Sequence, residues 1–165
     1  MRLLADTFPL LVGIGPKRYD EAAVMEMGAA FEPHFKAGKR YAFVCVQPKG
    51  TATPGAHERK LILDWADSPR VRRYATELCV SAATVVDGAV IRGALTAILW
   101  FWRPPFPMKA VATPQLGMDY CLHQLSLAGV ALPVSLEALR ARAQAQLDAA
   151  LGAPAPVGST GGRGH

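Results

Sequence analysis

Hydrophobic and polar positions along the chain follow two periods, and together these predict both strands and helices. Short apolar runs at residues 3–4 and 10–14 predict a hairpin or a bent pair of strands. The spacing then changes, and Val24 and Phe31 fall on one face of a predicted helix that starts near Asp20. This change of period within one short stretch indicates an α/β organisation.

The same alternation continues through the middle of the chain. Residues 41–46 form an uninterrupted apolar run, as expected for a central strand that is covered on both faces. The predicted elements that follow are helices over 55–66 and 70–76, a strand over 78–86, a largely apolar helix over 89–102, a strand over 108–112 and a helix from Thr113-Pro114 to Gly129.

This order of elements predicts one α/β domain over residues 1–132. We expect a single, mostly parallel or mixed sheet of about four or five strands flanked by helices, with right-handed crossovers. An apolar stripe predicts an appended C-terminal amphipathic helix over 133–151. The Gly-, Pro- and Ala-rich residues 152–165 are expected to form a disordered tail.

Composition adds expectations about where the protein acts. Residues 78–102 are the most apolar stretch, but Asp87 and Arg92 within it argue against a transmembrane helix. The first apolar run is broken by Pro9 and Gly13, unlike the long apolar region of a secretory signal. Three well-separated cysteines in apolar contexts suit reduced thiols better than disulfides. We therefore expect a cytoplasmic protein without a membrane span.

The basic charge of the chain is a weak indication of its partners. The formal net charge is +5, yet lysines and arginines are spread along the sequence and alternate with acids. The densest basic group, Arg70, Arg72 and Arg73, is flanked by Asp67 and Glu77 and is interpreted as an ion-paired turn. No interleaved aromatics or known reader motif accompany it, so nucleic acid is not an expected partner.

The loop after the predicted central strand is one candidate site. It contains Gly50, Thr51, Thr53 and Gly55 and lies before a helix N-terminus, where open α/β sheets often bind ligands and backbone N–H groups favour anions. It has neither a phosphate-loop nor a dinucleotide-binding string. The hypotheses are anion binding or modification of a threonine, and the alternative is an ordinary loop.

No residue constellation in the sequence predicts catalysis. His57 is next to Glu58, but adjacent helical positions point in different directions. Cys45 lies in an apolar strand without a neighbouring cation, which favours core packing. His34 and His123 have no ligand partners at metal-binding spacing. We predict no enzyme, cofactor or metal; an enzyme using Cys45 or His57 would require these side chains to converge in a cleft.

The aromatic segment at the end of the apolar helix is the second candidate site. Trp100, Phe101 and Trp102 are consecutive, and helical neighbours are about 100° apart, so at least one should point away from the sheet. Either the helix 133–151 covers it, or a second subunit does. The functional hypothesis is that these residues and Phe106 bind another protein or a second copy of the chain.

Four features of the chain together carry a resemblance to a known family. They are the opening hairpin, the strand 41–46 with its loop into a helix, the string Ile91-Arg92-Gly93-Ala94-Leu95-Thr96-Ala97-Ile98-Leu99-Trp100, and the strand 108–112 followed by Thr113-Pro114. This organisation resembles STAS-like domains, the fold of the bacterial anti-sigma-factor antagonists, over roughly residues 3–130.

The resemblance implies non-enzymatic protein binding, so we expect a subunit or regulator in a bacterial complex. The Ala-rich composition also suits a bacterial source. Residues 47–53 have no acid beside a serine, which departs from the phosphoserine turn of that family, and a phosphoswitch of that kind is not expected. Kinship of the fold with CRAL-TRIO lipid-transfer domains implies an alternative, a carrier of an apolar small molecule or lipid beneath the helix 89–102.

Overall fold

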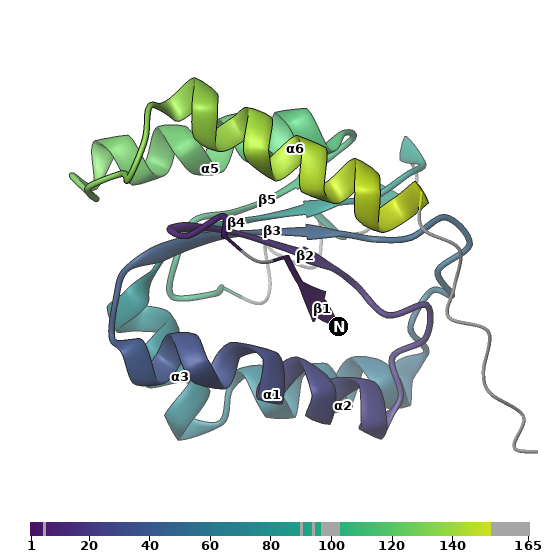
Figure 1. Cartoon of the computed structure of the whole chain (residues 1–165). Coiled ribbons are helices and arrows are strands. Elements are labelled where there is room, and N and C mark those ends of the chain that lie inside the picture. The colour runs from purple at the N-terminus through teal and green to yellow at the C-terminus, as the bar shows by residue number, and fades with distance from the viewer. Residues whose placement is uncertain (5, 90, 94, 97–102, 153–165) are drawn as a thin grey trace, which may run out of the picture.

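The fold places one mixed sheet between two layers of helices (Figure 1). The computed structural model describes residues 1–152 except 5, 90, 94 and 97–102. In Figure 1, helices α1, α2 and α3 lie on one side of the sheet, the lower face, and α5 and α6 lie on the other, the upper face. The predicted α/β class with a single helix-flanked sheet is therefore confirmed.

The five strands of the sheet follow one another in sequence order, β1-β2-β3-β4-β5. They are β1 (Arg2–Leu3), β2 (Leu10–Ile14), β3 (Tyr41–Val46), β4 (Cys79–Val85) and β5 (Met108–Val111). β1 is antiparallel to β2, as the predicted hairpin requires, and the other neighbours are parallel. The parallel part brings the carboxyl ends of β2, β3, β4 and β5 to one edge.

The helices begin and end close to the residues that the sequence signals indicate. They are α1 (Glu21–Ala37), α2 (Ala56–Ala66), α3 (Pro69–Leu78), α5 (Pro114–Leu127) and α6 (Leu136–Gly152). The Asp20 carboxylate accepts from the Ala23 N–H at 2.9 Å, and Gly38 ends α1 with a φ of 62°. Thr113 caps α5 in the same way. The apolar helix predicted over 89–102 lies partly outside the described residues.

The lower face of the sheet is packed with aromatic rings. Phe31 of α1 meets Phe43 of β3 edge to face, with ring centroids 4.9 Å apart. Phe35 stacks on Tyr74 of α3 at 4.8 Å. Such pairs add roughly 0.5–1.5 kcal/mol each to the burial of the rings. This cluster therefore fixes α1 and α3 against the lower face.

The upper face is packed with aliphatic side chains, and α6 belongs to this layer. Leu139, Ala143 and Leu147 of α6 are 0% exposed and lie in the same cluster as Val12 and Val44. α6 contacts both α5 and β2. The predicted C-terminal helix thus packs, together with α5, on the upper face of the sheet. Its serine cap is present, because the Ser135 hydroxyl accepts from the Ala138 N–H at 3.2 Å.

We expect Leu147→Ala to lower the free energy of unfolding by about 2–5 kcal/mol, because it leaves a cavity in a fully buried position. The matched control is Leu151→Ala in the same helix, where the side chain is 50% exposed and the cost should be about 1 kcal/mol or less. Urea unfolding followed by circular dichroism measures both. Equal effects of the two substitutions would show that α6 does not close the upper core.

Candidate functional site

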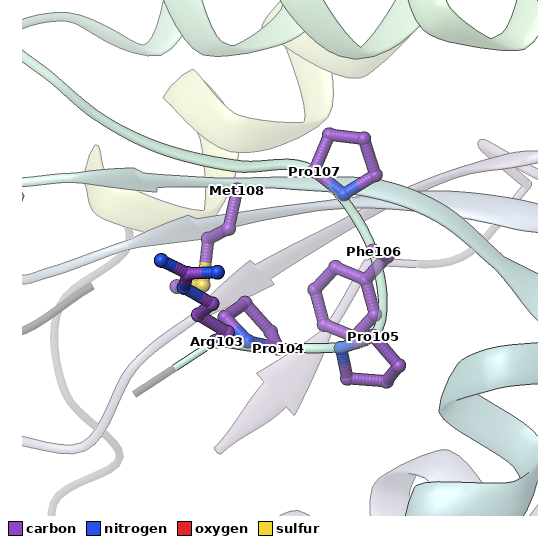
Figure 2. Close-up of a pocket in the computed structure, with 6 residues that line it drawn as sticks. All are labelled: Arg103, Pro104, Pro105, Phe106, Pro107 and Met108. Carbon is purple, nitrogen blue, oxygen red and sulfur yellow. The ribbon is translucent and has the colours of Figure 1, made fainter. Parts of the chain in front are cut away.

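A surface pocket of about 430 Å³ lies where the chain approaches β5. It is lined by residues 103–108, which follow the predicted aromatic run directly. Figure 2 shows this segment in a U-shaped turn, with the side chains of Arg103 and Met108 near its open end. The pocket is an open surface hollow lined by this one segment of the chain, and it is not an enclosed cavity.

Three prolines in the lining segment restrict the backbone of this turn. Pro104, Pro105 and Pro107 fix their own φ angles and disfavour helical conformations in the residues before them. The Pro107 carbonyl accepts a hydrogen bond from the Ala82 N–H of β4 at 2.9 Å, which ties the turn to the sheet. The prolines and this hydrogen bond therefore restrict the backbone of the turn.

Phe106 is the predicted binding residue whose position the structure gives. It is half-buried and packs in part against the aromatic cluster of the lower face. Because α6 packs on the upper face, it does not cover Phe106, so the alternative in which this helix caps the aromatic segment does not hold for that residue. Trp100, Phe101 and Trp102 lie outside the described residues.

The second candidate, the loop at residues 50–55, follows the carboxyl end of β3. The N–H and the hydroxyl of Thr51 both donate to the Pro48 carbonyl, at 3.1 and 2.7 Å. Gly50 has a φ of 75°, which this turn requires and which other residues rarely adopt. Thr53 is exposed, whereas the Thr51 hydroxyl is held inward by the turn. Of the two threonines, Thr53 is the more accessible to a modifying enzyme.

Gly55 is the N-cap of α2 and has no capping side chain of its own. A Cβ atom at Gly55 would lie 2.6 Å from Oε2 of Glu58, so this carboxylate sits beside the start of the helix. A carboxylate there complements the positive end of the helix and occupies the place where an external anion would bind. The geometry favours an ordinary loop, in which the hydrogen bonds of Thr51 and the carboxylate of Glu58 come from the chain itself. Anion binding at this loop stays a prediction.

Gln47, Tyr19 and Cys45 form a polar cluster near the carboxyl ends of β2 and β3. The sequence patterns did not predict it. Nε2 of Gln47 donates to the Tyr19 hydroxyl at 2.5 Å and lies 3.4 Å from Sγ of Cys45. Oε1 of Gln47 is buried and has no hydrogen-bond partner among the described residues. A Cβ atom at Gly15 would lie 2.6 Å from that oxygen, so the glycine makes room for the amide. No local sequence signal links these residues, because they meet only when the strands pair.

The cysteines are poorly suited to nucleophilic chemistry. Burial raises the pKa of the Cys45 thiol to about 12, and burial likewise raises the pKa of Cys121 to about 12. The pKa of Cys79 is also raised by burial. His57 is exposed on the first turn of α2, and the side chain within hydrogen-bond distance of the Cys45 thiol is Gln47. The structure therefore does not pair Cys45 with His57 as a nucleophile and base.

The basic residues Arg70, Arg72 and Arg73 on α3 all form ion pairs, in agreement with the interpretation from the sequence. Arg70 donates to both carboxylate oxygens of Glu32 on α1, at 2.5 and 2.7 Å. Arg72 pairs with Asp67 at 2.9 Å, and Arg73 pairs with its neighbour Glu77 at 3.1 Å. These pairs are exposed and each contributes little to stability. They do neutralise the patch, which leaves little local charge to attract a phosphate backbone.

The described part of the chain contains neither a cluster of metal ligands nor an apolar helix of membrane-spanning length. Within it, no group of three or more His, Cys, Asp or Glu side chains is placed to hold a metal ion. None of the helices described has the length and apolar character needed to cross a membrane.

No family model, curated protein or solved structure matches this chain. Proposals about its function therefore rest on its own residues and geometry.

We expect the three cysteines to be almost unreactive towards a disulfide reagent in the folded protein at pH 8. A thiol with a pKa of about 12 is ionised in only about one molecule in ten thousand at that pH. Reaction with Ellman's reagent before and after unfolding in urea measures this, and all three thiols should react only after unfolding. Rapid reaction of one thiol in the folded protein would identify an activated cysteine and contradict the argument.

The raised thiol pKa values also predict a loss of stability at alkaline pH. The folded state holds the protons of Cys45 and Cys121 up to about pH 12, whereas unfolded thiols release them near pH 8.5. Their stabilising contribution is thus complete below pH 8.5 and falls by up to about 1.4 kcal/mol per pH unit per thiol above it. Urea titrations across this range should show a shallower fall for the double variant Cys45→Ala/Cys121→Ala; an unchanged slope would contradict the assignment.

Proposed function

We propose that this chain is a STAS-like, cytoplasmic, non-catalytic protein-binding module that acts as a subunit or regulator in a bacterial complex. The observation that carries the proposal is the proline-framed pocket at residues 103–108. Elements on which the family resemblance rests are present, namely the β1-β2 hairpin, β3 with its loop into α2, and β5 followed by the Thr113 cap. The raised pKa values of the thiols support a role without nucleophilic catalysis.

The pocket offers an apolar wall beside a positive charge. Phe106 and Met108 are half-buried, so each contributes apolar surface to the lining while remaining anchored to the domain. The Arg103 side chain is exposed at the open end of the turn. A partner with an apolar side chain next to a carboxylate matches this arrangement, since arginine pairs well with carboxylates and aromatic residues serve as interface anchors.

Preorganisation favours binding at this segment over the strand-end loops. Ordering flexible side chains and loops on binding costs affinity, and a proline-rich turn loses less freedom than an unrestrained loop. The hydrogen bond from Ala82 to Pro107 adds to this restraint. Trp100, Phe101 and Trp102 directly precede the pocket in sequence, and we include them in the proposed binding segment.

We expect Arg103→Glu to reduce capture of the native partner at least tenfold, because it reverses the charge at the mouth of the pocket. The control is Arg18→Glu, which makes the same charge change at another exposed site, in the loop after β2. Native co-purification followed by mass spectrometry identifies the partner, and quantitative capture compares the variants with the wild type. Equal capture by both variants and the wild type would place the binding surface elsewhere.

A carrier of an apolar small molecule or lipid beneath the segment 89–102 is the second candidate function, and that segment lies partly outside the described residues. The observation that favours it is the apolar surface that Phe106 and Met108 contribute to the open hollow directly after that segment. Native mass spectrometry of the protein purified from its source separates the two functions. A stoichiometric bound mass that is lost in Phe106→Ser would support the carrier. An unliganded chain that still captures its protein partner would support the binding module and exclude the carrier.

A further inference from the structure

β5 is the last strand in the order of the sheet, and it continues directly from the pocket at residues 103–108. Its inner edge is bonded to β4 at both ends: the Ala82 N–H donates to the Pro107 carbonyl at 2.9 Å, and the Val86 N–H donates to the Val111 carbonyl at 3.0 Å. No further strand of the described chain pairs with its outer edge. A strand edge in this state offers unpaired N–H and carbonyl groups to an added strand.

The register of β5 shows which of its main-chain groups face outward. Residues 107 and 111 both face β4, and the main-chain groups of successive strand residues point to alternate sides. The main-chain groups of Met108 and Ala110 therefore face away from the sheet. Pro107 occupies an inward position, so its missing N–H removes no donor from the outer edge. Met108 and Ala110 thus each offer a donor and an acceptor to an added strand.

The side chains along this edge differ between the two faces of the sheet. The Lys109 ammonium lies 4.6 Å from the centre of the Tyr120 ring of α5, which places this cation on the upper face. Its neighbour Met108 projects to the lower face, where it lines the pocket with Phe106. An added strand would therefore meet a cation on the upper face and an apolar surface on the lower face.

The charge of this segment indicates the chemistry of the added strand. Residues 103–112 contain two cations, Arg103 and Lys109, and no acid. Both cations are exposed, and neither forms a salt bridge with a described residue. A lysine on an edge strand opposes pairing with a second copy of the same edge, because like charges would meet. Carboxylates on the added strand would instead be attracted to these cations.

We propose that the outer edge of β5 binds an extended segment of the protein partner in which acidic residues alternate with apolar ones. The acidic side chains lie near Lys109 on the upper face, and the apolar side chains lie beside Met108 on the lower face, because strand side chains alternate between faces. This inference rests on the proposed function, since it names the partner segment that lies along the pocket. β5 has four residues, so the pairing is short and the binding is weak.

A labelled hexapeptide of alternating glutamate and valine, with blocked ends, is the probe for this edge. Fluorescence anisotropy with the full chain should give a dissociation constant of about 1 mM or lower. The matched control peptide alternates lysine and valine, and it should bind at least tenfold more weakly because its charge is reversed. Equal binding of the two peptides, or no binding of the acidic peptide at millimolar concentration, would overturn the proposal.

Ala110→Pro tests the main-chain pairing, because proline removes the outward N–H of residue 110 and leaves the inner edge free to bond to β4. The matched control is Ala110→Ser, which keeps that N–H. The proline variant should bind the acidic hexapeptide about tenfold more weakly than the wild type, because one hydrogen bond is lost and its acceptor is left unpaired. The serine variant should bind as the wild type does. Unchanged binding by Ala110→Pro would contradict the pairing.

Amide hydrogen exchange of the wild type gives a second measurement that does not depend on the folding of a variant. The acidic hexapeptide should slow exchange at Met108 and Ala110, and it should leave Lys109 and Val111, which face β4, unchanged. Slowing at neither outward amide would overturn the proposal.

Capture of the native partner separates this inference from the proposed function. Both Arg103→Glu and Ala110→Pro should lose capture. Loss in Arg103→Glu with full capture by a folded Ala110→Pro would retain the pocket and overturn the edge pairing. Full capture by both variants would overturn the pocket and the edge pairing together.

Discussion

Burial of β3 on both faces is the constraint on which the rest of the structure depends. Its alternate side chains enter two different cores, with Tyr41 and Phe43 in the lower aromatic layer and Ala42 and Val44 in the upper aliphatic layer. A parallel sheet must be covered on both sides, which requires α1 to α3 below and α5 with α6 above. Gly117 lets α5 approach closely, since a Cβ atom there would lie 3.1 Å from Val44. The glycine therefore allows α5 to pack closely against β3.

This two-sided burial leaves the edges and ends of the sheet as the places where function can arise. At the carboxyl edge, several polar groups are met from within the chain: Thr51 donates to Pro48, Glu58 lies at the start of α2, and Nε2 of Gln47 donates to Tyr19. Oε1 of Gln47 is the exception, since it is buried without a hydrogen-bond partner among the described residues. Near the start of β5, the proline-framed turn instead leaves a pocket with an exposed arginine. Open α/β folds often bind ligands at the carboxyl ends of their strands. In this chain, the candidate site is instead the pocket at residues 103–108, which precedes β5.

Local signals predicted the elements well, because capping and periodicity act over a few residues. Asp20, Gly38 and Thr113 each marked a helix end that the structure contains. The placement of α6 could not be predicted, since an amphipathic stripe shows that a face is buried but not which surface it meets. The contact of Gln47 with Tyr19 depends on strand pairing, and the half-burial of Phe106 depends on the proline turn. Both are tertiary features without a local signature.

Amide hydrogen exchange of the chain, alone and with the protein that co-purifies with it, tests the binding surface most directly. The lining segment has amide protons at Arg103, Phe106 and Met108, because its other residues are prolines. We predict that the partner slows exchange at these amides and leaves the loop at residues 50–55 unchanged. Protection confined to that loop, with residues 103–108 exchanging as in the free chain, would contradict the assignment of the pocket as the binding surface.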